Sequence, residues 1–93
     1  MLKGITTSGF AFEIEDKALD SWELLEALVD VDNGHYSATV RVARLLLDKA
    51  QLDRLKEHCR DSETGIVSQN KMFAELADIL KGTGSDDEKA KNV

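Results

Sequence analysis

The sequence predicts a mainly helical fold, a small bundle of about four helices with a short N-terminal β-hairpin. Apolar residues recur at helical spacing in several segments, cap-like residues precede three of these segments, and apolar and polar residues alternate near the N-terminus. The chain has 93 residues, 42% of them hydrophobic, which suits one core. Because the residues after Leu80 are small and charged until Val93, we expect one domain over 1–82 and a disordered tail over 83–93.

The N-terminal segment is expected to form the hairpin. Phe10, Phe12 and Ile14 alternate with more polar residues, so this strand has one apolar face. Residues 2–7 supply the partner strand, and the Ser-Gly pair at 8–9 supplies the turn. Since an isolated hairpin is only marginally stable in water, this one must pack on the helices or on another subunit.

The first long helix is predicted over residues 21–32. Asp20 is the expected N-cap, and Glu23 lies three residues later, as in a capping box. The Asn-Gly pair at 33–34 ends the helix. Its apolar face is expected to centre on Trp22, Leu25, Leu28 and Val29 and to be widened by Leu24, Ala27 and Val31.

Two more helices are expected on either side of Asp48. The earlier one covers about 37–47, and its stripe contains Val40, Ala43 and Leu47, with Leu46 beside it. Asp48 is the predicted N-cap of the later one, and Gln51 completes the capping box. The apolar positions of this helix are Leu52, Leu55 and Cys59.

The last helix is predicted over residues 69–81, after the cap residue Ser68. Its apolar stripe contains Met72, Phe73, Leu76, Ile79 and Leu80. Met72 and Phe73 are adjacent, so they cannot both occupy the centre of that stripe. Methionine adapts to varied surfaces, which suits a binding site for varied helical sequences. We name Trp22, Met72 and Phe73 as candidate protein-binding residues. The alternative is that Met72 and Phe73 are both core residues.

The net charge of −6 is unevenly distributed. Residues 1–36 carry eight acidic and two basic side chains, whereas residues 37–60 carry three acidic and six basic ones. An acidic chain repels phosphates overall, so no nucleic-acid partner is expected. The basic middle favours an acidic protein surface, including the chain's own first long helix, and self-association would supplement a small core.

No catalytic, cofactor or metal site is predicted. His58 and Cys59 are adjacent and would point about 100° apart on a helix, and His35 is the only other histidine, so a zinc set is incomplete. There is no Ser-His-acid pattern of recognised spacing and no phosphate-binding loop. No apolar run approaches the roughly 18 residues of a membrane span, and none follows the N-terminal Met. We expect a cytoplasmic, non-enzymatic protein.

A family resemblance emerges from the order of several segments. They are the leucines at 45–47, LDRLKEHCR at 52–60, the polar turn at 61–65, MFAELADIL at 72–80, the strand at 10–14 and the helix that begins WELL at 22–25. In this order the chain resembles the small tail assembly chaperones of long-tailed bacteriophages and related prophages. The likeness covers roughly residues 7–82.

The resemblance implies a function without catalytic residues. Such a chaperone binds the tape-measure protein, keeps that helical chain soluble while tail-tube subunits gather around it, and acts in the host cytoplasm without entering the mature virion. In this family a longer form is often made by minus-one ribosomal frameshifting. The candidate frameshift site here is Ala90, Lys91 and Asn92, because the codons GCA-AAA-AAC would contain the slippery heptamer A-AAA-AAC.

Two alternatives from other classes stay open. The two helices that meet at Asp48 could belong to a small DNA-associated regulator, since they carry Arg41, Arg44, Lys49, Arg54, Lys56 and Arg60. Against this, acidic residues are interspersed and the join has no glycine. The acidic N-terminal part would instead suit an inhibitor or antitoxin-like binding protein. Salt-sensitive duplex binding would favour the regulator, and a neighbouring toxin gene would favour the antitoxin.

Overall fold

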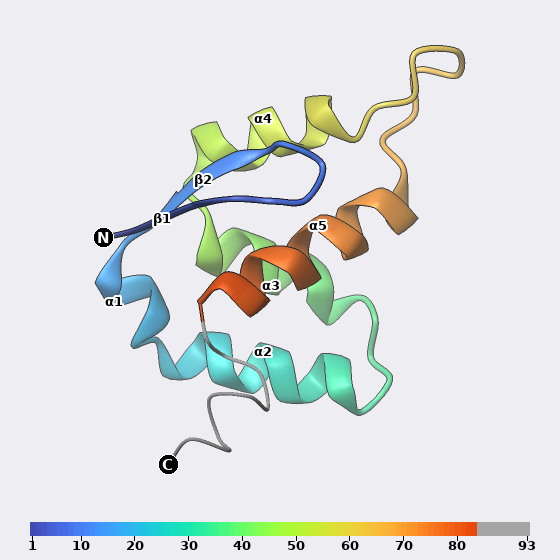
Figure 1. The fold of residues 1–93 in the computed structure, drawn as a ribbon. Helices are drawn as coiled ribbons and strands as arrows, with labels where there is room; N and C mark the ends of the chain where they lie inside the picture. The colour runs from blue at the N-terminus through green and yellow to red at the C-terminus, as the bar shows by residue number, and fades with distance from the viewer. Residues whose placement is uncertain (84–93) are drawn as a thin grey trace.

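The computed structural model describes residues 1–83 and shows a mainly helical protein with an N-terminal antiparallel hairpin (Figure 1). This confirms the predicted fold class. In the described residues the elements are β1 (Leu2–Ile5), β2 (Ala11–Ile14), α1 (Asp16–Leu19), α2 (Trp22–Asp32), α3 (Ala38–Leu46), α4 (Lys49–His58) and α5 (Gln69–Gly82). The four-residue helix α1 was not predicted.

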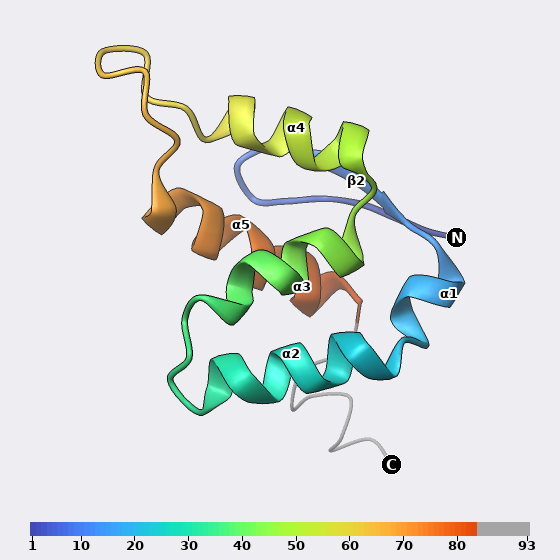
Figure 2. The ribbon, with the colours of Figure 1, turned by 180° about the vertical axis from the view of Figure 1, so that it is seen from behind.

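The hairpin packs on the helices, as expected. β1 and β2 pair in the register Leu2 with Ile14, and Gly9, with φ of +96°, provides the turn. Phe10, Phe12 and Ile14 are all buried, with no more than 5% of each exposed. Both ribbon views place the hairpin beside α4 (Figures 1 and 2). The apolar edge that the sequence shows is therefore covered by the chain's own helices.

The predicted cap of α2 was wrong by one residue. Ser21 is the N-cap, and its Oγ accepts a hydrogen bond from the Leu24 N–H at 3.1 Å. Glu23 accepts a weak bond from the Ser21 hydroxyl at 3.4 Å. Asp20 is instead the C-cap of α1, and its N–H donates to the Asp16 carbonyl. Because α1 ends at this point, Asp20 lacks the extended backbone that an N-cap needs.

The predicted core face of α2 was wrong at its centre and right at its margin. Leu24 and Ala27 are buried, whereas Trp22, Leu25 and Val29 are exposed by 64%, 50% and 48%. Of the other residues on the predicted face, Leu28 and Val31 pack partly against the core. α2 carries apolar residues on two sides, and helical spacing cannot decide which side meets α3.

α3 and α4 are separate helices joined at Asp48. Leu47 and Asp48 both have extended backbones, and Asp48 Oδ1 accepts from the Gln51 N–H at 2.8 Å, which confirms the predicted cap. The Gln51 side chain does not form the predicted capping box, because its Nε2 donates to Asp48 Oδ2 at 3.2 Å and it accepts from a residue other than Asp48. Its Oε1 accepts from the Glu13 N–H at 2.7 Å and its Nε2 donates to the Glu13 carbonyl at 2.8 Å, so it ties α4 to β2.

The apolar stripes of α3 and α4 were predicted with one error. Leu52, Leu55 and Cys59 are buried as expected, and so are Ala43 and Leu47. On α3 the core position is Val42, however, and the predicted Val40 is 54% exposed. The physical reason is again that packing against α2 and α4, rather than spacing alone, selects the buried side.

α5 begins at Gln69, as predicted, and ends at Gly82, one residue after the predicted end. Ser68 caps it by accepting from the Lys71 N–H at 3.2 Å. Thr83 belongs to the helix end, not to the predicted tail, because its N–H donates to the Ile79 carbonyl and its hydroxyl donates to the Leu80 carbonyl. The rest of the predicted tail, including the candidate frameshift residues Ala90, Lys91 and Asn92, lies outside the described residues.

Candidate functional site

The three predicted protein-binding residues do not form one site. Met72 is partly buried, and Phe73 is 38% exposed, so the alternative that both are core residues fails for Phe73. Both side chains line the same cleft on α5. Trp22 lies on α2, is 64% exposed and does not line that cleft. The structure therefore groups Met72 with Phe73 and leaves Trp22 on a different surface.

Two apolar clefts lie beside Phe73. One, of about 200 Å³, is bounded by α3, α4 and α5, and the other, of about 250 Å³, is bounded by α2, α3 and α5. Thr39, Phe73 and Leu76 line both clefts, so we treat them as one surface, the Phe73 groove. The remaining apolar lining is Val40, Ala43, Leu52, Val67 and Met72 in the first cleft and Leu28, Val31, Tyr36, Val42, Ala77 and Leu80 in the second.

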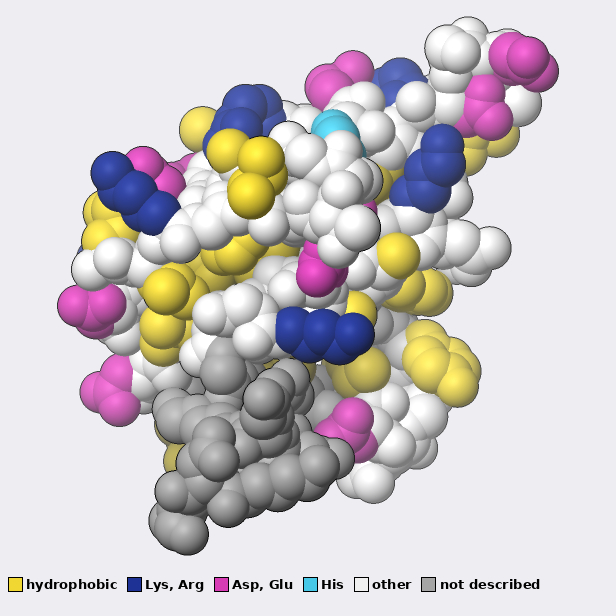
Figure 3. Space-filling model, in the orientation of Figure 1, with side chains coloured by type: hydrophobic (Ala, Val, Ile, Leu, Met, Phe, Trp, Pro, Cys, Tyr) yellow, Lys and Arg dark blue, Asp and Glu magenta, His cyan; other side chains and the backbone are white. Residues whose placement is uncertain are grey.

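Two groove residues were missed as candidates. Tyr36, in the connection between α2 and α3, is 69% exposed, and Val40 is 54% exposed. Figure 3 shows hydrophobic side chains gathered at the right edge of the molecule, over the start of α5 and the α2–α3 connection. Spacing placed Val40 in the core, and no sequence signal distinguished Tyr36 from an ordinary loop residue.

The Phe73 groove has a basic end. Arg44 and Lys56 line the first cleft, whereas the second cleft has no charged lining residue. Within residues 1–83, neither Arg44 nor Lys56 lies within ion-pair distance of a carboxylate. Since neither charge is held in a close ion pair there, both can attract an acidic group on a molecule that enters the groove.

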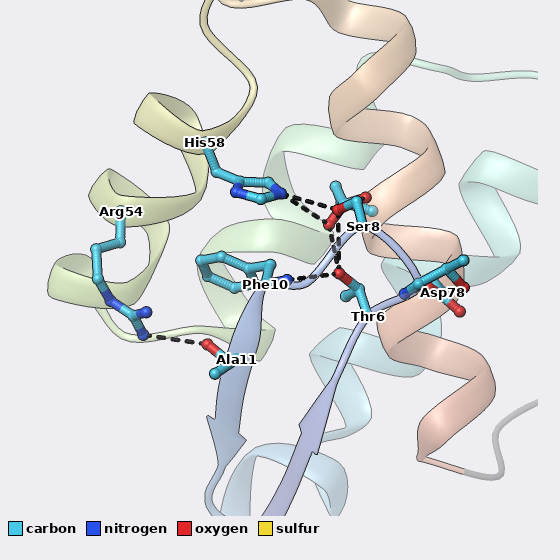
Figure 4. A network of polar contacts seen from close by, with 9 residues as sticks. Thr6, Ser8, Phe10, Ala11, Arg54, His58 and Asp78 are labelled. Carbon is cyan, nitrogen blue, oxygen red and sulfur yellow. Dashed lines mark hydrogen bonds and ion pairs between the residues drawn. The ribbon is translucent and has the colours of Figure 1, made fainter.

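A polar cluster joins the hairpin turn to α4 and α5 (Figure 4). Glu75 is buried, with 8% of its surface exposed. Its carboxylate accepts hydrogen bonds from the Thr6 hydroxyl at 2.8 Å and the Ser8 hydroxyl at 2.9 Å. Ser8 Oγ and His58 Nε2 are 2.8 Å apart. Nearby, the Thr7 N–H donates to Asp78 Oδ2 at 2.6 Å. These bonds hold the turn against both helices.

Although it contains a serine, a histidine and a carboxylate, this cluster lacks the geometry of a hydrolase triad. In a triad the histidine accepts the serine proton at one ring nitrogen and donates to the acid from the other. Here the Ser8 hydroxyl is within hydrogen-bond distance of both Glu75 Oε2 and His58 Nε2. Glu75 also lies nearest to this same nitrogen, at 3.8 Å. The serine and the carboxylate thus meet the same ring nitrogen, which is not the triad arrangement, and the cluster anchors the hairpin.

The single cysteine is part of the core. Cys59 is 1% exposed, and burial, followed by the nearby Glu75 carboxylate, raises the pKa of its thiol. A thiol with a raised pKa is a weaker source of thiolate at neutral pH. In the described part of the chain, no three His, Cys, Asp or Glu side chains are grouped as a metal site would need. Among the helices of residues 1–83, none is long and apolar enough to cross a membrane.

Half of the basic residues considered for DNA binding already contact other parts of the protein. Lys49 pairs with Asp53 at 2.9 Å, and Arg60 pairs with Glu57 at 2.6 Å. Arg54 lies over the Phe10 ring, 4.9 Å from its centre, and donates to the Ala11 carbonyl. These contacts make α4 a mixed-charge surface more than a basic one, whereas α3 carries Arg41 and Arg44 and no acidic residue.

Comparisons of the chain with protein-family models, with curated proteins and with solved structures found no match.

Proposed function

We propose that this chain is a non-enzymatic tail assembly chaperone of a long-tailed phage or prophage, which binds a helical segment of the tape-measure protein in the Phe73 groove. The observation that carries the proposal is the groove itself, an apolar surface with Phe73, Tyr36 and Val40 partly or largely exposed along it. Grooves of this kind receive the apolar face of an amphipathic helix.

The lining chemistry suits a client whose sequence varies along its length. Met72 is unbranched and adapts its shape, while Phe73 and Tyr36 offer large rigid surfaces with few rotatable bonds. Burying one leucine-sized client side chain in such a groove contributes about 1.5–3 kcal/mol. Several such contacts would shield a long helical chain from aggregation and still let the tail-tube protein displace the chaperone.

The sequence resemblance is the basis for five parts of this proposal. They are the identity of the client, the tail-tube partner, the location in the host cytoplasm, the absence from the virion and the frameshifted longer form. Reading the gene tests this part directly. A large helical reading frame immediately downstream, and a slippery heptamer across the codons of Ala90, Lys91 and Asn92, would support it. Another codon set at these positions would remove the longer form without affecting the chaperone proposal.

The binding site is tested with a fluorescently labelled fragment of the tape-measure protein encoded beside this chain. Phe73→Ala should weaken binding by about tenfold or more, as expected for an aromatic contact in the centre of an interface. Ile5→Ala is the matched control, because Ile5 is 69% exposed on β1 and does not line the groove. Circular dichroism checks that both variants fold.

The outcomes separate the site from the function. Wild-type affinity of a folded Phe73→Ala variant would remove Phe73 from the site. Failure of the wild-type chain to bind any part of the tape-measure protein would overturn the proposed function. Titration of the same chain with duplex DNA is the counter-test, because tight, salt-sensitive binding would favour the regulator instead.

A further inference from the structure

α2 carries an apolar stripe that is largely uncovered by the rest of residues 1–83. Trp22, Leu25 and Val29 are each about half exposed or more, and their spacing places them within an arc of about 60° on the helix. The opposite side of α2, with Leu24 and Ala27, packs into the core. This outer stripe is therefore free in the described structure and contributes little to the fold.

The outer stripe is bordered by acidic residues. α2 contains Glu23, Glu26, Asp30 and Asp32 and no lysine or arginine. Glu26 and Asp30 lie about 40° and 80° from Trp22 around the helix, next to the stripe. Among residues 1–83, none of the four carboxylates of α2 is in an ion pair. The stripe and the acidic residues beside it, here called the α2 outer face, thus form an amphipathic surface whose carboxylates are unpaired among residues 1–83.

The Phe73 groove is complementary to this face in both respects. Its lining is apolar, and its basic end carries Arg44 and Lys56 without ion-pair partners among the described residues. A contact between two α2 outer faces would instead bring eight carboxylates together, since each copy contributes four. Like charges placed opposite one another cost several kcal/mol, so that arrangement is disfavoured.

We propose that α2 of one copy of this chain docks in the Phe73 groove of a second copy, with Trp22, Leu25 and Val29 against the apolar lining and Glu26 and Asp30 facing Arg44 and Lys56. The inference needs only the groove and does not depend on the client being a tape-measure protein. Because both occupants use one groove, self-association keeps the groove covered until a client displaces α2.

Trp22 is the sole tryptophan, so its fluorescence reports on this contact directly. Raising the concentration of the purified chain should shift Trp22 emission to shorter wavelengths, and sedimentation should show association over the same range. Tryptophan emission that stays that of an exposed ring while the chain associates would overturn the proposal, because another surface would then form the contact. A chain that remains monomeric at all concentrations would overturn it as well.

Charge reversal identifies the two faces. Glu26→Arg with Asp30→Arg, and separately Arg44→Glu with Lys56→Glu, should each weaken association by about tenfold or more. An equimolar mixture of these two double variants should associate again, since each reversed α2 then meets a reversed groove and each native α2 meets a native groove. Failure of the mixture to associate, with both variants folded, would overturn the assignment of the faces.

Two matched controls remove the effect of net charge. Glu15→Arg with Glu63→Arg changes the net charge as much as the α2 variant, and Lys3→Glu with Lys17→Glu changes it as much as the groove variant. None of these four residues lines the groove or belongs to α2. Both controls should associate like the wild-type chain, and equal weakening in the controls would show that overall charge, not the proposed contact, governs association.

Discussion

The side of the molecule where the hairpin meets α4 and α5 differs sharply from the side where α2, α3 and α5 border the Phe73 groove. On the hairpin side Phe12 and Ile14 are buried, and the turn is held by bonds from Thr6 and Ser8 to Glu75. On the groove side Tyr36 and Val40 are more than half exposed, and clefts separate α5 from its neighbours.

The difference indicates how a chain of this size divides its apolar residues. A small domain has limited apolar surface to bury, so exposed side chains such as Trp22 and Tyr36 represent stability that the monomer does not use. The buried residues and hydrogen bonds of the hairpin side stabilise the fold, so apolar side chains along the groove can remain exposed. Apolar truncations should therefore affect stability on one side and association on the other.

The largest expected effect on stability is Ile14→Ala. Ile14 has no exposed surface, so its truncation should lower the free energy of unfolding by about 2–5 kcal/mol. Ile5, in the same hairpin but 69% exposed, is the matched control, and Ile5→Ala should change it by about 0.5 kcal/mol or less. Denaturant unfolding measures both. Equal effects of the two substitutions would break the comparison, because the hairpin would then not be anchored through its buried face.

A smaller loss is expected for Glu75→Ala. The substitution removes the acceptor of the Thr6 and Ser8 hydroxyls, and leaving such groups unsatisfied costs about 1–3 kcal/mol. Glu63→Ala in the exposed loop before α5 is the control and should be close to neutral. Amide hydrogen exchange in the hairpin turn should rise only in the Glu75 variant. An unchanged exchange rate there would show that the polar cluster does not hold the turn.

The smallest effect is expected at Asp48, where α4 begins. The backbone N–H of Gln51, and then its side chain, lower the pKa of the Asp48 carboxyl from its ordinary value. A carboxyl whose pKa is lower in the folded state contributes stability above its unfolded pKa, and this is lost as pH falls through the folded value. The denaturant midpoint of Asp48→Ala should thus lie below that of the wild-type chain at pH 7, with the gap closing below about pH 4.

Asp20→Ala is the natural control for Asp48→Ala, because Asp20 precedes a helix in the same sequence context but does not cap it. Its midpoint should match that of the wild-type chain at both pH values. A gap for Asp48→Ala that persists unchanged at pH 3 would show that the charged cap is not the cause.

Features that depend on near neighbours were determined by the sequence alone. The caps at Asp48 and Ser68 and the turn at Gly9 each satisfy backbone groups within a few residues, so their residue types indicate their conformation. The alternation through Phe10, Phe12 and Ile14 likewise identified the buried face of β2. Adjacency also indicated that Met72 and Phe73 cannot both occupy the centre of the α5 stripe, and in the structure Met72 is partly buried while Phe73 is 38% exposed.

Features that depend on which elements meet were decided only by the tertiary structure. The side of α2 that packs, the exposure of Val40, and the partners of Gln51 and Glu75 all involve residues far apart in the chain. The Phe73 groove is of this kind, because it exists only where α2, α3 and α4 face α5. Helical spacing shows that an apolar stripe is present, but burial lowers the free energy only against a partner surface, and the fold alone determines where that surface lies.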